Sequence, residues 1–241
     1  MADRELPERG EHPPFDGAHL RLEGGEDHRA GLRLQVAAAR YGAYRWVERR
    51  LFELTGAWAA APGLPDEAQV FCFEASAQHA WHAELWEARL PVLAGVDREQ
   101  LTRPLGTVVE PLLARLAPAA FDGAGEDAGR CFLVGLARVV LPLLLVSYRG
   151  LGRRLVPVAD APAMRALTLV LRDEEEERAA VQSMVDAMLV TPEAARQAEE
   201  WTQALVGPAP GLQVLQLGWH DEAEVGARDA LLPWAEGDAA W

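Results

Sequence analysis

The sequence is poor in cysteine and in clustered basic residues, and each scarcity bears on the class of protein. Its two cysteines, Cys72 and Cys131, lie in apolar stretches without a ligand-like spacing, which predicts reduced, packed thiols rather than a disulfide framework. Lysine and arginine number 23 against 37 aspartates and glutamates, for a net charge of −14. Because phosphate binding needs clustered positive charge, we expect neither nucleic acid nor an anionic membrane as a main partner.

The sequence also lacks a convincing membrane span. Its most apolar run, residues 132–148, contains Arg138 and Pro142 and is shorter than the roughly 20 residues that cross a bilayer. We expect this run to form a central bundle helix. Because no charged segment followed by an apolar run opens the chain, the sequence indicates a cytoplasmic protein. Nucleophile elbows, phosphate loops and CxxC pairs are absent too, and no organic cofactor is expected.

The organisation of the chain follows from its composition. Residues 1–30 are rich in glycine, proline and charge and lack periodicity, which predicts a flexible N-terminal arm. Residues 31–206 are expected to form one helical domain. Residues 207–241 are predicted to be an irregular tail, in which Trp219, Trp234 and Trp241 could anchor the chain on the bundle.

Apolar residues at helical spacing predict an all-α fold. The expected helices cover residues 32–61, 65–93, 105–116, 128–155, 161–190 and 191–207. Pro142 is expected to bend the fourth of these, and Thr191 followed by Pro192 predicts the start of the last. The four long helices favour an antiparallel four-helix bundle, with extra short helices and irregular termini.

The helical wheels direct several ionisable side chains toward the predicted core. At 100° per residue, Glu48 falls in the apolar arc of the first helix, and His79 and His82 in that of the second. Glu174 lies near the centre of the arc of residues 161–190, with Glu177 toward its edge. Buried charges are normally neutralised, paired or bound to metal.

The same wheels assign other residues to one face or the other. They place Phe52 in the apolar arc of the first helix and Arg45 outside it. They direct Ser76 and Asp173 away from the core.

Two interpretations of the inward groups remain open. Glu48, His79, His82, Glu174 and Glu177 are carboxylates and imidazoles of the kind that hold iron, manganese or zinc. Alternatively, the glutamates could pair with buried arginines, for which Arg40, Arg138 and Arg178 are available, and the histidines could hydrogen-bond without a metal.

Three segments carry a resemblance to a known family. YRWVERRLFELTGAW, QHAWHAELWEARLP and LVLRDEEEE resemble actinobacterial proteins grouped with the ferritin-like superfamily, over roughly residues 34–190. The most specific piece is His79-Ala-Trp-His82-Ala-Glu84-Leu-Trp86. The resemblance implies a helical bundle that binds two iron or manganese ions and activates dioxygen or peroxide.

The sequence departs from the pattern of that family. The family pattern supplies one glutamate from each of two helices and a Glu-x-x-His pair from each of the others. Here position 76, three before His79, is serine. The expected apolar helix, residues 128–155, contains no carboxylate and no histidine. The resemblance therefore implies a single ion or an asymmetric pair held by three helices.

Two functions follow as hypotheses. The first is an iron- or manganese-dependent oxidoreductase acting on a small molecule, with Glu48, His79, His82 and Glu174 as ligands. In it, Glu177 is a further ligand or base, Tyr44 or Tyr41 is a hydrogen-bonding or redox group, and the helix bent at Pro142 lines the substrate pocket. The second is a metal-free ferritin-like scaffold that binds a protein partner or forms a homodimer.

Overall fold

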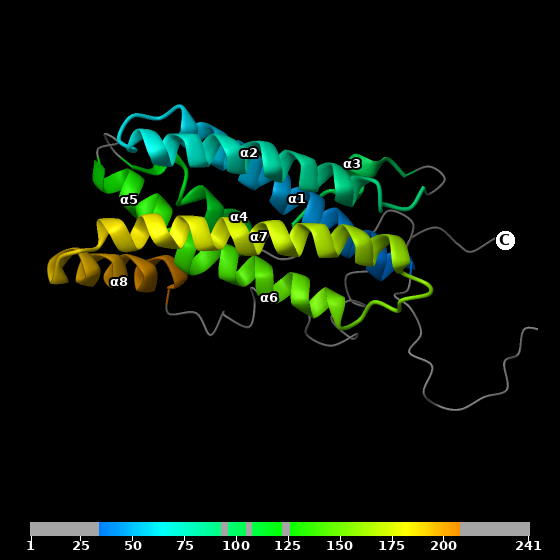
Figure 1. Ribbon diagram of the computed structural model, residues 1–241. Coiled ribbons are helices and arrows are strands. Elements are labelled where there is room, and N and C mark those ends of the chain that lie inside the picture. Colours follow the sequence, from blue (N-terminus) through cyan, green and yellow to red (C-terminus); the bar gives the residue numbers. More distant parts are fainter. Residues whose placement is uncertain (1–33, 93–95, 105–107, 122–125, 208–241) are drawn as a thin grey trace, which may run out of the picture.

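The computed structural model describes residues 34–92, 96–104, 108–121 and 126–207 of the chain (Figure 1). The predicted N-terminal arm, residues 1–30, lies outside the described residues. So does the predicted tail beyond Gly207, together with its proposed anchors Trp219, Trp234 and Trp241.

The described residues form helices and no strand, which confirms the all-α prediction. The elements are α1 (Leu34–Ala59), α2 (Asp66–Glu87), α3 (Arg98–Leu101), α4 (Val109–Ala114), the 3-10 turn η2 (Pro118–Ala120), α5 (Glu126–Gly135), the π-helical segment η3 (Leu136–Val140), α6 (Leu141–Gly152), α7 (Ala161–Met188) and α8 (Pro192–Val206).

Local sequence explains where the helices begin. The Thr191 side chain accepts a hydrogen bond from the backbone N–H of Ala194 at 3.1 Å, and Pro192 occupies the first position of α8. This is the predicted cap. Helix α2 begins at Asp66 after Pro65, with acidic residues in its first turn, where they interact favourably with the positive end of the helix dipole. It ends at Glu87, earlier than the predicted residue 93.

The long apolar helix is interrupted at the predicted place but in an unpredicted way. Segments α5, η3 and α6 follow one another without a loop, and η3 ends just before Pro142. The backbone N–H of Leu141 bonds to the carbonyl of Leu136, five residues back. Such π segments are rare and often lie near functional sites.

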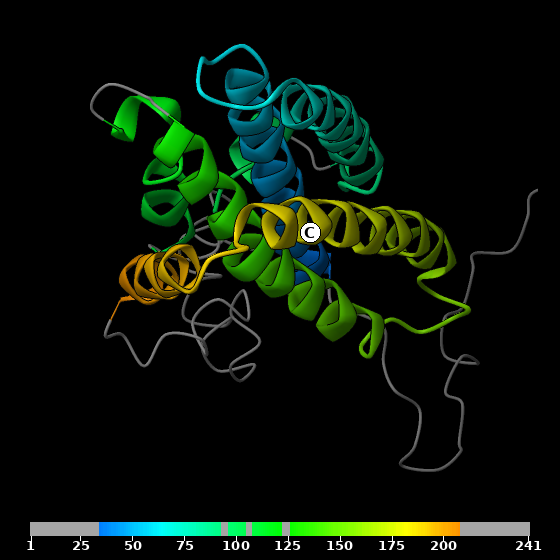
Figure 2. The ribbon, with the colours of Figure 1, turned by 60° about the vertical axis from the view of Figure 1, so that its left-hand side comes forward.

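Four long helical segments dominate the arrangement. Helices α1 and α2 lie side by side in opposite directions, and α7 packs against both α2 and α6 (Figures 1 and 2). The colours of Figure 1 show that α2 and α5–α6 run the same way, with α3 and α4 in the connection between them. Helix α8 returns along α5.

The apolar helix is a core element. In the described residues, Asp127–Gly152 is long and apolar enough to cross a membrane, yet 78% of its most apolar window is buried inside the protein. Phe132, Leu133, Leu136 and Leu141 are all fully buried. This burial is typical of the central helix of a water-soluble bundle and agrees with the interpretation of residues 132–148 as a bundle helix.

The wheel was wrong for two residues at the α1–α2 contact. Phe52, expected inside, is 44% exposed, whereas Ser76, expected outside, is 7% exposed. The Ser76 hydroxyl donates to the Phe52 carbonyl at 2.9 Å. The two helices approach closely here: a Cβ added to Gly56 would lie only 3.0 Å from the Ser76 oxygen. Small residues therefore occupy the contact, and the bulky ring is displaced outward.

Arg45, expected outside the core, is also buried, with 6% exposure. Its guanidinium lies 2.7 Å from Glu99 and 3.1 Å from Glu87, and donates to Thr102 as well. The short helix α3 covers this arginine, and a wheel of α1 alone cannot anticipate that cover.

Candidate metal centre

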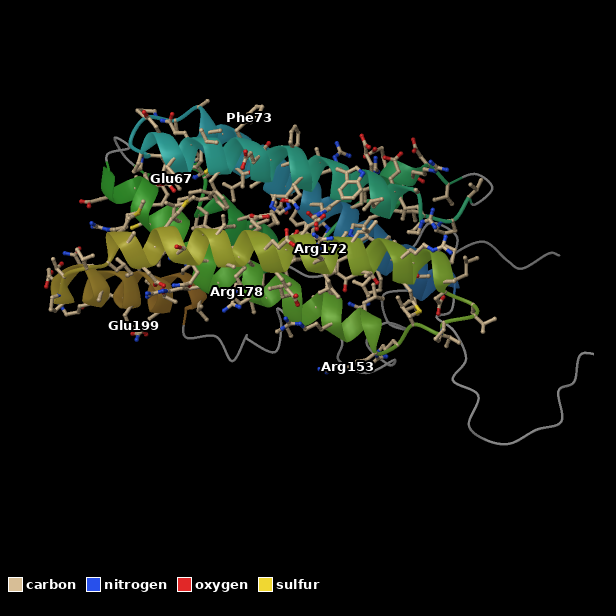
Figure 3. All side chains as sticks on the ribbon, in the orientation of Figure 1. Glu67, Phe73, Arg153, Arg172, Arg178 and Glu199 are labelled. Atoms are coloured by element: carbon tan, nitrogen blue, oxygen red, sulfur yellow. The ribbon has the colours of Figure 1, made fainter. Side chains whose placement is uncertain are left out.

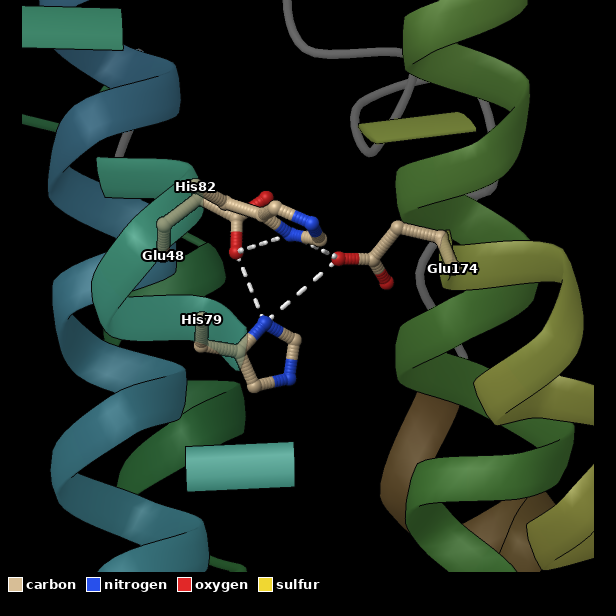
Figure 4. A group of neighbouring side chains, drawn as sticks. All are labelled: Glu48, His79, His82 and Glu174. Atoms are coloured by element: carbon tan, nitrogen blue, oxygen red, sulfur yellow. Dashed lines mark hydrogen bonds and ion pairs between the residues drawn. The ribbon is translucent and has the colours of Figure 1, made fainter. Parts of the chain in front are cut away.

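Three helices bring four ionisable side chains to one interior point. Helix α1 supplies Glu48, α2 supplies His79 and His82, and α7 supplies Glu174 (Figure 4). All four residues are 0% exposed. The histidines share one face of α2 because they stand three residues apart.

The four side chains present one donor atom each to a common centre. The chosen nitrogen and oxygen atoms all lie within 4.8 Å of one another. His79 Nδ1 is 2.7 Å from Glu48 Oε2 and 3.4 Å from Glu174 Oε1. His82 Nδ1 is 3.6 Å from Glu48 Oε2 and 3.2 Å from Glu174 Oε1. The buried Glu and His group could therefore hold a metal ion.

The separations can be compared with those that a tetrahedral ion imposes. Donors at about 2.0–2.2 Å from one ion stand about 3.3–3.6 Å apart. Three of the six donor pairs, at 3.2, 3.4 and 3.6 Å, have about this spacing. The contact of 2.7 Å between Glu48 and His79 is a hydrogen bond, and it would have to open by about 0.6–0.9 Å to admit an ion.

Carboxylates also face the outer nitrogen of each imidazole. His79 Nε2 lies 3.3 Å from Glu177 Oε2, and His82 Nε2 lies 3.2 Å from Asp173 Oδ2. Glu177 is 5% exposed, in agreement with its expected inward direction, but it lies outside the group of four inner donors. Asp173, expected to face away, was wrongly placed by the wheel. The His82 side chain extends across to the edge of α7, where its Nε2 lies next to the Asp173 carboxylate.

A residue that the sequence interpretation missed completes the centre. Tyr148 of α6 is 0% exposed, and its hydroxyl donates to Glu48 Oε1. Tyr44, the predicted hydroxyl near the ligands, instead bonds to the Ser147 hydroxyl at 2.9 Å and to the Ser147 carbonyl at 3.2 Å. The sequence signal was available: Tyr148 stands in an apolar helix, where a buried phenol needs a polar partner.

The centre strongly perturbs its own protonation. Burial raises the pKa of Glu48, but the hydrogen bonds and charges of His79 and His82 outweigh it and lower the pKa to about 2. Burial acts to lower the pKa of His82, but Glu174 and Glu48 raise it to about 10. The pKa of His79 is likewise raised well above its usual value, by Glu177 and Glu174 against the effect of burial. Both shifts favour the positively charged imidazolium form of the two rings when no ion is bound.

The negative charges exceed what the two imidazoles can balance. Three buried carboxylates, those of Glu48, Glu174 and Glu177, surround two histidines. Burial and the charge of Glu48 raise the pKa of Glu174. Within the described residues, Glu174 Oε2, both Glu177 oxygens and His79 Nε2 are buried without a hydrogen-bond partner, so the 3.3 Å contact of His79 with Glu177 is an ion pair only. Unsatisfied buried oxygens are rare, and a bound cation would give Glu174 and its neighbours a partner.

The alternative pairing with arginine does not occur among the described residues. The ion pairs of Glu48, Glu174 and Glu177 there are all with the two histidines. Arg178 is exposed on α7 (Figure 3). Figure 3 shows it on the same helix as the exposed Arg172, which pairs with Glu176.

A small aliphatic pocket lies at the bend, and whether a substrate uses it stays a prediction. Its walls are aliphatic side chains from α1, α4, η3 and α6, among them Val140, Leu143 and Leu144 on either side of Pro142. Val47, the neighbour of Glu48, lines it as well.

No protein-family model, curated protein or solved structure matches this chain. What the structure shares with the ferritin-like resemblance is coarser, namely an all-helical chain with a buried Glu and His cluster.

Proposed function

We propose that the protein binds one divalent transition-metal ion through Glu48 Oε2, His79 Nδ1, His82 Nδ1 and Glu174 Oε1. The observation that carries this proposal is the convergence of these four fully buried atoms within 4.8 Å. Taking several charged groups out of water is costly unless they are paired or bound to metal.

The residues around the four donors would hold them in place. Asp173 and Glu177 face the outer nitrogens of the histidines at 3.2 and 3.3 Å. In this role they keep the proton on Nε2, so that the lone pair on Nδ1 points inward. We therefore propose that Glu177 orients His79 rather than ligating the ion. Tyr148 fixes Glu48 in the same way, by donating to the oxygen that does not face the centre.

The donor set supports iron, with manganese next. It contains two imidazoles and two carboxylates, a combination suited to iron and manganese as well as zinc. The thiol of Cys72 is buried on the same helix but is not part of the group, and burial together with Glu177 raises its pKa to about 12. A thiolate-free set, with a tyrosine bonded to a ligand, favours a redox ion over a structural zinc.

We propose that the protein is an oxidoreductase of the ferritin-like kind. A bound iron or manganese ion would supply one-electron chemistry toward dioxygen or peroxide. The long connection between α2 and α5–α6, which run the same way (Figure 1), resembles ferritin-like bundles, which have one long crossover. The chain itself buries the centre, excludes water and holds the Tyr148 hydroxyl beside Glu48.

Metal content tests the first part of the proposal. The full chain is expressed in iron-supplemented medium and purified without chelators, and its metals are measured by elemental analysis. We expect about one ion per chain in the wild type, because the four donors of the described residues form one group. The double variant H79A/H82A should lose the ion. Glu176→Gln, an exposed neighbour on α7, should keep it.

Oxygen or peroxide consumption by the ferrous-loaded protein tests the second part. The wild type should consume one of these oxidants faster than free ferrous ion does. Uptake of the ion without any such consumption would indicate a structural metal and overturn the oxidoreductase assignment.

A metal-free scaffold is the second candidate, and one observation favours it. Glu48 Oε2 and His79 Nδ1 are 2.7 Å apart, which is a direct hydrogen bond rather than the spacing of two ligands. On this account the chain takes up no ion, and chelators leave its melting temperature unchanged. Two results would each favour the scaffold. One is a melting temperature that added metal does not change, and the other is a wild type that contains as little metal as H79A/H82A.

A further inference from the structure

The ligands of the proposed ion have no exposed surface. Glu48, His79, His82 and Glu174 are each 0% exposed, so a hydrated cation can reach their donor atoms only when one of these side chains moves aside. The four differ in how tightly their contacts hold them and in whether those contacts extend to the surface. These differences identify the side chain that can move.

Three of the ligands have their hydrogen bonds and ion pairs wholly in the interior. Within the described residues, Glu48 contacts the two histidines and Tyr148, all of them 0% exposed. Glu174 meets the same two histidines. His79 faces the two glutamates and, with its outer nitrogen, Glu177, whose side chain is 2% exposed. None of these contacts leads from the centre to solvent.

His82 differs from the other three, because two of its neighbours reach the surface. Its Nε2 lies 3.2 Å from Oδ2 of Asp173, whose side chain is 20% exposed. Its ring lies 5.7 Å from the ring of Trp81, which is 42% exposed. Asp173 belongs to α7 and Trp81 to α2. The centre is therefore connected to the surface between these two helices, through His82.

His82 is also held less tightly than the other histidine. Its hydrogen bonds to Glu174 and Asp173 are both 3.2 Å long, whereas His79 and Glu48 are 2.7 Å apart. Hydrogen bonds from nitrogen to oxygen are most often about 2.9–3.0 Å long and weaken as they lengthen. A turn of the His82 ring therefore breaks the weaker contacts of the centre and leaves the stronger one intact.

We propose that the ion enters between α2 and α7 past Trp81, with Asp173 as its first protein ligand and His82 as the side chain that turns to admit it. This inference rests on the proposed function. A partly exposed carboxylate can bind a divalent cation that still holds several of its waters. The inner donors then replace these waters, and the return of the His82 ring closes the site. Asp173 thus acts in entry as well as in orienting the imidazole.

Rate constants distinguish entry from orientation. Stopped-flow absorption follows the uptake of cobaltous ion by the full metal-free chain, because the visible spectrum of this ion changes when imidazoles and carboxylates replace its waters. An excess of chelator added to the loaded protein then measures dissociation. A carboxylate that attracts the incoming ion increases the association rate constant. One that only orients a bound ligand lowers the dissociation rate constant and leaves association unchanged.

Asp173→Asn should lower the association rate constant about tenfold, whatever it also does to dissociation through His82. The difference from the wild type should shrink as added salt screens the charge. Glu177→Gln is the matched control, because Glu177 faces the outer nitrogen of His79 in the same way but from the interior. This variant should increase only the dissociation rate constant, about 10–100-fold.

Trp81→Ala tests the route itself. Removal of the ring frees the path beside His82 without changing a donor atom, so association and dissociation should both become faster by the same factor, with the dissociation constant unchanged. Phe73→Ala is the control, because Phe73 is a 68% exposed aromatic residue of the same helix and does not belong to the group of ligands. It should change neither rate constant.

The remaining outcomes separate this inference from the proposed function. Association at the wild-type rate in Asp173→Asn would overturn the entry route and leave the metal site standing. Rate constants in Trp81→Ala that equal those in Phe73→Ala would do the same. A chain that takes up neither cobalt nor iron would overturn the proposed function and this inference together.

Discussion

Each histidine of the centre has an inner and an outer nitrogen, and the two face different carboxylates. The inner atoms face Glu48 and Glu174, and the outer atoms face Glu177 and Asp173. This division assigns ligation to one pair of acids and orientation to the other. It makes the two pairs separable by mutation.

Replacing an outer acid should weaken metal binding without abolishing it. Because Glu177 fixes the ring of His79, Glu177→Gln is expected to lower metal affinity about 10–100-fold. Competition with a chromogenic chelator measures this. Glu176→Gln, at an exposed position one residue away, should leave the affinity unchanged. Complete loss of binding in Glu177→Gln would instead make Glu177 a ligand.

Protons and the ion compete for the same nitrogens, which gives a pH dependence of known sign. The pKa of His82 is about 10 in the metal-free fold, against about 6.5 in an unfolded chain. A raised pKa stabilises the fold fully below about 6.5, and the contribution disappears as pH rises through about 10. The free energy of unfolding of metal-free protein should therefore fall between these values, as measured by urea denaturation.

Metal affinity should change in the opposite direction over the same range. Binding displaces the protons from His79 and His82, so the affinity rises with pH. Calorimetry in buffers of different ionisation enthalpy would count the released protons. An affinity that is independent of pH from 6.5 to 9 would contradict the assignment of Nδ1 of both histidines as ligands.

The sequence predicts those site residues whose ionisable side chains lie on an otherwise apolar helical face. Glu48, His79, His82 and Glu174 could be found because a charge on an apolar helical face is unusual. Tyr148 was missed because its ring counts as apolar and only its hydroxyl is polar. Its partner lies in α1, 100 residues away, and a wheel of one helix cannot reveal such a contact.

At the scale of elements, close approaches explain what periodicity could not. The helix ranges 32–61 and 161–190 were predicted within two residues of α1 and α7. The π segment η3 was not predicted, because an i to i−5 bond depends on how Pro142 is accommodated among neighbouring helices. The burial of Arg45 likewise depends on α3, whose position against α1 is set by tertiary contacts.

Gly42 allows α3 to lie against α1, and its replacement should displace that helix. A Cβ at this position would come 2.0 Å from the carbonyl oxygen of Leu101. Alanine would raise helix propensity by up to about 1 kcal/mol, but the clash is with backbone. We expect Gly42→Ala to lower the free energy of unfolding by about 1–3 kcal/mol.

Gly152 provides the control for this prediction. A Cβ there would meet only the end of the flexible Leu167 side chain, at 3.3 Å. Gly152→Ala should therefore be neutral or slightly stabilising in the same urea titration. Equal effects of the two variants would show that α3 does not depend on the close approach at Gly42.

At the scale of the whole molecule, the ion would join α7 to the consecutive helices α1 and α2. Helices α1, α2 and α7 each contribute to the centre, so binding should stabilise their mutual packing. An ion present at 100 times its dissociation constant adds about 2.7 kcal/mol to the free energy of unfolding. Thermal denaturation with and without ferrous ion should show a higher melting temperature that H79A/H82A does not share.

The arrangement of the bundle was only partly predictable. Helical spacing gave the four long segments and their inward faces, but not which segments run in the same direction. The direction of α5–α6 relative to α2 is decided by the long connection through α3 and α4, whose short helices carry weak periodicity. The ferritin-like arrangement stays a prediction for the same reason.

The most direct test is a crystal structure of the iron-loaded protein with diffraction data collected on both sides of the iron absorption edge. The account predicts one anomalous peak at the centre of Glu48 Oε2, His79 Nδ1, His82 Nδ1 and Glu174 Oε1, about 2.0–2.3 Å from each, with the hydrogen bond between Glu48 and His79 opened. A peak at another place, or no peak with that hydrogen bond intact, would contradict it.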